Sequence, residues 1–288
     1  MKKPSPARLA LQWWFDAPAN AHVSANIAVD FTVARAYLAR LQSGGAAVTV
    51  HHLVMAVIAR VLREFPAANA RIFAGRIVRK DEVGVIMPVN LLGYSDRSEL
   101  SMTILPRVDR MPLRELAARQ RRETAEERKG TPANPLFRAL FRMAESLPEP
   151  AVRRSLDLLD LAWRTPGLSE AGWSLAPFTT AVTNPGAAFS RPEASPGVWF
   201  RGAAVSLPQR LTHVGTLWGV SGVQPEVVPV DGRPEVRPIL PVVLVFDHRL
   251  FDGVMAGRIL TRFAQILQDP SSVFGQDGER AAADALPG

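Results

Sequence analysis

A cluster of ionisable residues near the C-terminus carries the strongest indication of chemistry in this chain. Asp247, His248 and Arg249 are consecutive, and Asp252 follows within one turn. An imidazole has an unperturbed pKa of about 6.5, so a histidine held by its neighbours can accept a proton near neutral pH. General base catalysis of this kind accelerates a reaction by roughly 10²–10⁴-fold. The residue types therefore indicate a general base at His248, and a solvated ion-pair cluster at a strand end is the plainer alternative.

Two regular elements are expected to hold this cluster. Residues 242–246 form an unbroken run of apolar β-formers, which predicts a strand buried on both faces. After Gly253, apolar residues recur at helical spacing until Asp269-Pro270 predicts the end of a helix. A strand, a tight polar turn and a helix would therefore carry His248 on rigid supports.

The remaining chain mixes helical and strand patterns. Residues 22–30 alternate apolar and polar side chains, as a half-buried strand does, and Thr49 predicts the N-cap of a helix over 50–65. Short apolar runs separated by turn residues predict a meandering sheet between 71 and 108, and the chain is again sheet-rich from 178 onward. This mixture predicts an α/β fold.

Residues 130–175 differ in character from the rest. Apolar residues form one helical stripe over 136–144 and another over 152–163, and arginines flank both stripes. Two helices packed on the body or on a neighbouring subunit explain the pattern. The sharper alternatives are a hydrophobic lid over an acyl chain and a weak membrane-surface contact through 136–163.

The composition limits the kinds of site. A chain of 288 residues with 47% hydrophobic content can bury a sizeable core. The absence of cysteine excludes disulfides, thiolate metal sites and cysteine nucleophiles, and the five histidines lack metal-ligand spacing, so we expect no metal. A net charge of +7 suggests an anionic partner, which could be nucleic acid, a membrane surface or a phosphate-bearing cofactor. No long apolar run or signal-peptide pattern is present, so we expect a soluble, cytoplasmic protein.

The motif Asp-His-Arg-x-x-Asp-Gly at residues 247–253, between an apolar strand and a helix, resembles the signature of the catalytic domain of dihydrolipoyl acyltransferases. These are the acyltransferase components of 2-oxo acid dehydrogenase complexes, and they share a fold with chloramphenicol acetyltransferase. The resemblance covers about 7–274, because weaker blocks keep the family's order. These blocks are Ala21-His22-Val23-Ser24 with Val29-Asp30, the segment 62–69, Thr183-Asn184-Pro185-Gly186, and Trp218-Gly219-Val220 followed by the hairpin signal Asp231-Gly232.

This resemblance implies a fold and a reaction. The fold would be a two-layer α/β sandwich with a mixed sheet, as a single catalytic domain over 1–288 with a helical insertion at about 121–175. His248 would remove a proton from the thiol of coenzyme A or of a dihydrolipoyl group. The thiolate would then attack a thioester carbonyl directly, without an acyl-enzyme.

The resemblance also implies roles for two further residues. A hydroxyl from another subunit donates to the oxyanion in this family, and Thr183 occupies the position of the serine in Ser-Asn-x-Gly. One oxyanion donor is typically worth about 2.7–4 kcal/mol. Asp252 would hold the turn through an ion pair, with Arg8 as the proposed partner.

The chain departs from the family in its flanking regions. It has no lipoyl domain, partner-binding domain or Pro/Ala-rich linker, so we expect a free-standing enzyme with no covalently bound lipoyl group. The family's large cores are joined by an apolar C-terminal anchor, whereas 281–288 offers only Leu286, which predicts a homotrimer that assembles no further. The small and polar residues of 276–288 predict a frayed end.

We therefore expect a coenzyme A-dependent acyltransferase that works as a homotrimer on a small-molecule acyl donor and acceptor and binds no nucleic acid. The positive charge would partly serve the phosphates of coenzyme A, although the sequence does not identify the residues that contact them. The alternative from another class is a non-catalytic trimeric scaffold with a degenerate acyltransferase fold.

Overall fold

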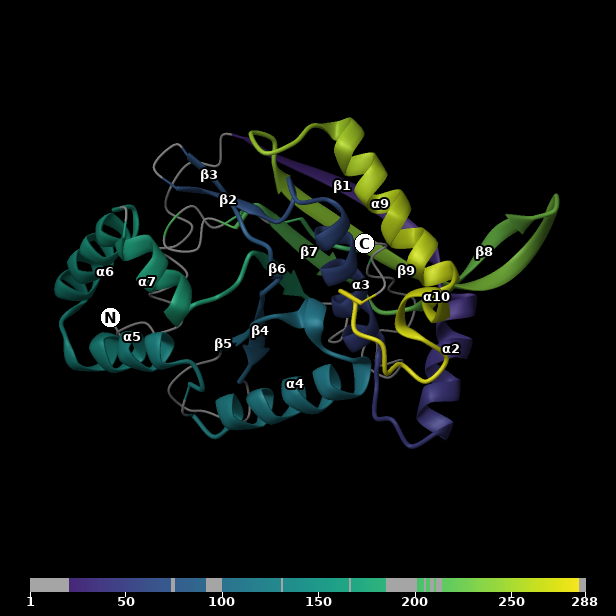
Figure 1. The fold of residues 1–288 in the computed structure, drawn as a ribbon, viewed down its shortest axis with the longest axis horizontal. Helices are drawn as coiled ribbons and strands as arrows, with labels where there is room; N and C mark the ends of the chain where they lie inside the picture. The colour runs from purple at the N-terminus through teal and green to yellow at the C-terminus, as the bar shows by residue number, and fades with distance from the viewer. Residues whose placement is uncertain are drawn as a thin grey trace.

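One mixed β-sheet organises the molecule (Figure 1). The computed structural model describes residues 21–73, 76–91, 100–130, 132–165, 167–184, 201–204, 206–207, 210 and 214–284. Within them, a seven-stranded sheet has the order β1-β9-β7-β6-β4-β5, with β8 paired to β9, and β2 and β3 form a separate two-stranded sheet. The strands are β1 (His22–Asp30), β2 (Ala70–Phe73), β3 (Arg76–Arg79), β4 (Val85–Asn90), β5 (Leu100–Leu105), β6 (Thr180–Thr183), β7 (Thr216–Val220), β8 (Gln224–Val230) and β9 (Arg233–Asp247).

The sheet is mixed because β6 runs parallel to both of its neighbours, whereas the other strand pairs are antiparallel. Helices connect and cover the strands. They are α2 (Thr32–Ser43), α3 (Val50–Glu64), α4 (Leu113–Arg128), α5 (Pro135–Ser146), α6 (Glu149–Trp163), α7 (Leu168–Leu175), α9 (Gly253–Gln268) and α10 (Pro270–Phe274), with a 3-10 turn η1 (Val108–Arg110). The expected α/β architecture with a mixed sheet is confirmed.

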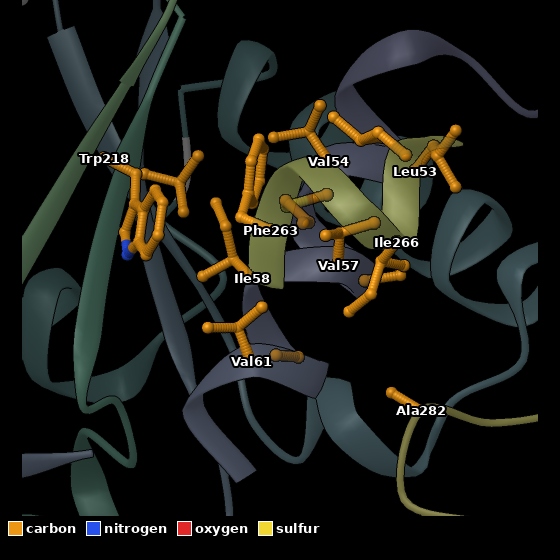
Figure 2. Packing of buried hydrophobic residues seen from close by; sticks show 14 of the residues in the cluster. Leu53, Val54, Val57, Ile58, Val61, Trp218, Phe263, Ile266 and Ala282 are labelled. Atoms are coloured by element: carbon orange, nitrogen blue, oxygen red, sulfur yellow. The ribbon is translucent and has the colours of Figure 1, made fainter. Parts of the chain in front are cut away.

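The main core lies between one face of the sheet and helices α2, α3 and α9. Alternate residues of β9, such as Leu244 and Phe246, point to this face and are fully buried. Trp218 of β7 stacks on Phe263 of α9 with ring centroids 5.3 Å apart (Figure 2). Every residue of α3 from His52 to Leu62 is buried, so this helix forms the centre of the layer.

Residues of α5 and α6 pack on the opposite face of the sheet, and α7 packs against α6. The intervening residues of β9, Val243 and Val245, belong to a second apolar cluster that includes Trp163 of α6 and Phe137 of α5. These helices are therefore packed on the body of the same chain, which was the plainer of the interpretations of this segment. Since α4 continues to Arg128, the helices on this face begin at Pro135.

The C-terminal segment corrects one expectation. We predicted a frayed end from residue 276, yet Ala281 and Ala282 are buried, at 4% and 0% exposure. The carbonyl of Ala282 accepts a hydrogen bond from Arg60, at 3.0 Å, and Ala283 N–H donates to the carbonyl of Asp109, at 2.7 Å. For residues 276–284 the prediction was wrong, because small side chains, which resemble those of a loose tail, here fit closely against α3 and η1. Residues 285–288 lie outside the described part of the chain.

A second expectation also needs correction. Residues 203–207 were included in the sheet-rich region, but their described positions belong to no strand. One of them, Leu207, is instead buried in the second apolar cluster and contacts the start of β1.

Candidate active site

His248 lies at the end of β9, where the chain leaves the sheet. Its backbone N–H donates to the carbonyl of Ala21 at 2.7 Å, and the N–H of Asp247 donates to the carbonyl of Gly215 at 3.0 Å. The imidazole follows Phe246 on the same face of the strand, with ring centroids 6.0 Å apart, and its side chain is exposed. The backbone is thus held from two sides while the ring stays accessible to a reacting group.

Asp247 and Arg249, the two neighbours of this histidine in the chain, form an ion pair with each other. Oδ1 of Asp247 accepts from the backbone N–H of Arg249 at 3.0 Å and from its Nε at 2.9 Å, and Oδ2 accepts from Nη2 at 2.6 Å. Burial alone would raise the pKa of Asp247, but the hydrogen bonds from Arg249 outweigh it and hold that pKa below its ordinary value. Both oxygens of the Asp247 carboxylate therefore already accept hydrogen bonds from Arg249, whereas the His248 side chain is exposed and can act as the base.

His22 is a part of the site whose role sequence reasoning missed. The register of β1 and β9 places it directly opposite Asp247. Its Nδ1 accepts a hydrogen bond from Leu207 N–H at 3.1 Å, which leaves the ring proton on Nε2. Burial lowers the pKa of His22, while the charge of Asp247 acts in the opposite direction. His22 therefore links residues 206–207 to the end of β9 that precedes His248. The sequence block Ala21-His22-Val23-Ser24 could not show this link, because it depends on how β1 pairs with β9.

Asp252 is the N-cap of α9. Its Oδ1 accepts from Met255 N–H at 2.8 Å, and the residue is exposed. The carboxylate thus satisfies a free N–H group of the first turn and faces the positive end of the helix dipole. The ion pair expected from Arg8 falls outside the described residues.

Thr183 is the last residue of β6 and is half-buried. The strand registers align it with Gly219 of β7 and, through that residue, with Val243 of β9. His248 lies five positions further along β9, or about 17 Å at 3.3–3.4 Å per residue. The structure therefore does not bring Thr183 and His248 of one chain together.

The described residues contain neither a candidate metal site nor a candidate membrane-spanning helix. No group of three or more His, Cys, Asp or Glu side chains in this part of the chain could hold a metal ion. Among the helices described, none combines the length and the apolar character that crossing a bilayer would require.

Residues 213–275 match the family described as 2-oxoacid dehydrogenases acyltransferase (catalytic domain). The match includes β7, the turn with His248 and all of α9. This segment of the chain is therefore similar to the 2-oxoacid dehydrogenase acyltransferase family. The motif that first suggested the family lies inside the matched segment.

Curated relatives of this acyltransferase segment are succinyltransferase components of 2-oxoglutarate dehydrogenase complexes. The protein from Rickettsia bellii is 28% identical over 72 residues, which cover 25% of this chain and 18% of the relative. The human mitochondrial protein is 38% identical over 52 residues, or 18% of this chain and 12% of the relative. The chain thus spans less than a fifth of the length of these relatives.

Solved acyltransferase structures match over a much larger part of the chain. A probable dihydrolipoamide acetyltransferase from Listeria monocytogenes superposes with a TM-score of 0.61 at 15% identity, covering 91% of this chain and 89% of that one. The dihydrolipoamide acetyltransferase of Azotobacter vinelandii gives a TM-score of 0.60 at 20% identity, covering 94% and 93%. At these identities the likeness shows the fold, and the fold implied by the motif is confirmed.

Proposed function

We propose that this chain is a coenzyme A-dependent acyltransferase in which His248 is the general base. The observation that carries the proposal is the exposed imidazole at the end of β9, beside a carboxylate that Arg249 has already neutralised. The Azotobacter structure was determined to study a serine, a histidine and an asparagine in catalysis, and that histidine precedes the asparagine by four positions. His248 precedes Asp252 by the same interval.

The proposed reaction needs one base and no covalent intermediate on the protein. His248 takes the proton of an attacking thiol, from coenzyme A or a dihydrolipoyl group, and the thiolate adds to the carbonyl carbon of a thioester. The tetrahedral intermediate collapses with cleavage of the bond to the leaving sulfur. That sulfur takes the proton from the imidazolium, so the histidine returns to its neutral form.

The oxyanion of this intermediate would accept a hydrogen bond from Thr183 of another protomer. The two residues are offset by about 17 Å along the strand direction and also lie two strands apart in one chain, so a donor from the same chain cannot reach. A shared site of this kind requires an oligomer. We propose a homotrimer, in which each of three equivalent interfaces would pair one histidine with one threonine.

The hairpin of β8 and the first part of β9 supports assembly. It projects from the body at the end opposite α5, α6 and α7 (Figure 1). Val227 and Val236 face each other across the hairpin and are 68% and 69% exposed. A lone two-stranded hairpin is only marginally stable in water, and paired apolar side chains at its surface are typical of a contact with another chain.

Acyl transfer to a dithiol acceptor tests the activity. Short and long acyl-coenzyme A donors should release free coenzyme A in the presence of dihydrolipoamide, and His248→Ala should lower the rate by roughly 10²–10⁴-fold. Arg258→Ala, an exposed change on α9, serves as the matched control and should leave the rate unchanged. If the unmodified chain releases no more thiol than His248→Ala with any donor, the scaffold interpretation replaces the enzyme.

Light scattering tests the assembly. The unmodified chain should have the mass of three protomers, and Val227→Glu with Val236→Glu should dissociate it, whereas Leu161→Glu at the opposite end should not (Figure 1). A monomeric mass for the unmodified chain at micromolar concentration would remove the shared site from the proposal.

A further inference from the structure

His22, the first residue of β1, packs beside the strand end that leads to His248. The N–H of Asp247 donates to Gly215, just before β7. The next N–H, that of His248, donates to Ala21, just before β1. His22 and Asp247 are therefore a non-hydrogen-bonded pair of the antiparallel ladder, whose Cα atoms lie about 4.5 Å apart with both side chains on one face. The imidazole of His22 is thus held close to the carboxylate of Asp247.

The same ring also holds a distant segment of the chain. Nδ1 of His22 accepts a hydrogen bond from the backbone N–H of Leu207 at 3.1 Å. Leu207 is 1% exposed and belongs to the second apolar cluster, and His22 itself is half-buried. A neutral imidazole has one acceptor nitrogen and one donor nitrogen, so this bond requires the proton to be on Nε2. The neutral ring therefore ties the 206–207 segment to the end of β9.

Protonation of His22 would break this contact. Both nitrogens of an imidazolium are donors, so the buried N–H of Leu207 would lose this acceptor. The imidazolium would face Asp247, whose two oxygens accept from Arg249, and would compete with the arginine for the same carboxylate. A single proton on His22 would thus disturb both the 206–207 segment and the ion pair on either side of His248.

The surroundings of His22 favour the neutral ring at pH 7. Burial lowers the pKa of His22, the charge of Asp247 acts to raise it, and the charge of Arg249 adds to the lowering. Arg210, on the neighbouring segment, is paired with Asp157 of α6. Because the pKa of the folded chain lies below the ordinary value of about 6.5, the hydrogen bond at Nδ1 is intact at neutral pH and is lost as the pH falls through that lowered pKa.

We propose that His22 is a positioning residue, whose neutral ring holds the 206–207 segment and the Asp247–Arg249 ion pair in the arrangement that His248 needs. The inference rests on the proposed acyltransferase function. His22 touches no reacting atom and acts through Asp247, the neighbour of the base in the chain. Acyl transfer therefore loses rate for two reasons as the pH falls, because the base itself takes up a proton and because the hydrogen bond between His22 and Leu207 breaks.

Two substitutions separate the hydrogen bond of this ring from its charge. His22→Asn keeps an acceptor oxygen near the position of Nδ1 but cannot take up a proton near neutral pH. His22→Phe keeps an aromatic ring and loses the acceptor. At pH 7.5, kcat/KM for acyl transfer should be nearly unchanged in His22→Asn and about tenfold lower in His22→Phe, the ratio that corresponds to the loss of one hydrogen bond.

The pH profile of kcat/KM distinguishes a positioning role from a merely structural one, because this quantity reports the titrating groups of the free enzyme. Between pH 7.5 and pH 5, the unmodified chain should lose about threefold or more additional activity compared with His22→Asn, which lacks the second titrating group. A merely structural role would change the rate equally at every pH. Parallel profiles for the unmodified chain and His22→Asn would overturn the proposal.

Nuclear magnetic resonance of the unmodified chain tests the contact without any need for turnover. The ring nitrogens of His22 should show a proton on Nε2 alone at pH 7.5, and the protection of the Leu207 N–H from hydrogen exchange should fall about tenfold or more as that ring takes up its second proton. The N–H of Phe31, which donates to Pro238 beyond the other end of β1, is the control and should keep its protection. A doubly protonated His22 with unchanged protection of Leu207 also overturns the proposal. If Leu207 responds but no acyl transfer is detected at any pH, the proposed function fails and the proton-dependent contact stands.

Discussion

Replacing Arg249 by methionine should destabilise the catalytic turn in a way that depends on pH. In the folded chain, Arg249 donates three hydrogen bonds to Asp247 from its guanidinium and one from its backbone N–H. The carboxylate side chain is 6% exposed, whereas the arginine side chain is 53% exposed. The substitution removes the cation and leaves a buried charge with only the backbone donor.

The size of the effect follows from these exposures. Breaking a fully buried ion pair costs about 3–5 kcal/mol, and an exposed pair contributes about 0–1 kcal/mol. Because one partner is buried and the other is half in water, we expect a loss of about 2 kcal/mol in the free energy of unfolding at pH 7. Urea unfolding of Arg249→Met, with Arg258→Met as the exposed control, measures this loss.

The pH dependence separates this cause from a general loss of side-chain contacts. In the unmodified chain the pKa of Asp247 is lowered, so its contribution to stability is present at neutral pH and is lost as the pH falls through the folded-state pKa. In Arg249→Met, burial would instead raise that pKa, so the carboxyl group would take up a proton at higher pH and its charge penalty would vanish. The difference between the two proteins should therefore shrink between pH 7 and pH 4.5.

A double-mutant cycle completes the test. Asp247→Asn removes the charge that Arg249 neutralises, so adding Arg249→Met to Asp247→Asn should cost much less than about 2 kcal/mol. The reasoning is refuted if the arginine substitution costs the same in both backgrounds, or if its cost at pH 4.5 equals its cost at pH 7.

Three further predictions concern the same turn and the first turn of helix α3. Gly215→Ala should destabilise the fold and lower acyl transfer, because the added Cβ would lie 2.3 Å from the carbonyl oxygen of Ala70 and 2.4 Å from Cδ1 of Leu250. The control is Gly257→Ala on α9, where the added Cβ meets open space. It should be neutral or stabilising in the same thermal unfolding and activity assays. Asp252→Ala should cost about 1 kcal/mol by urea unfolding through loss of the N-cap, and equal stability would contradict the capping role. Burial lowers the pKa of His51 to about 4, below its unfolded value of about 6.5. The contribution of His51 to the free energy of unfolding is therefore complete above pH 6.5 and falls toward pH 4. Urea unfolding should show a loss of about 2 kcal/mol between pH 7 and pH 5, and a His51→Gln variant should lack this loss.

The local patterns around the site were sufficient to predict its elements. The apolar run before Asp247 predicted a buried strand, and the helical spacing after Gly253 predicted α9. The dipeptide Asp231-Gly232 predicted the hairpin, and both residues have positive φ, at 48° and 76°. These features depend on side chains a few residues apart, so a short stretch of chain contains all the information that they need.

Contacts between distant segments required the structure. Opposite Asp247 lies His22, because the two strands pair in one register and a shift of a single residue would turn that histidine to the other face. The convergence of Arg71 and Lys80 on Trp173 joins residues about 100 positions apart. No local pattern specifies such a contact, because it depends on how all the layers pack.

The sequence by itself thus determined which residue could act as a base, the strand, turn and helix that carry it, and the family that its C-terminal segment resembles. Only the tertiary structure decided that Thr183 stands far from His248 in the same chain, that α5 and α6 pack on the second face of the sheet, and that Ala282 is buried. Backbone propensity and hydrophobic period act over a few residues, whereas strand register and close contact are properties of the whole folded chain.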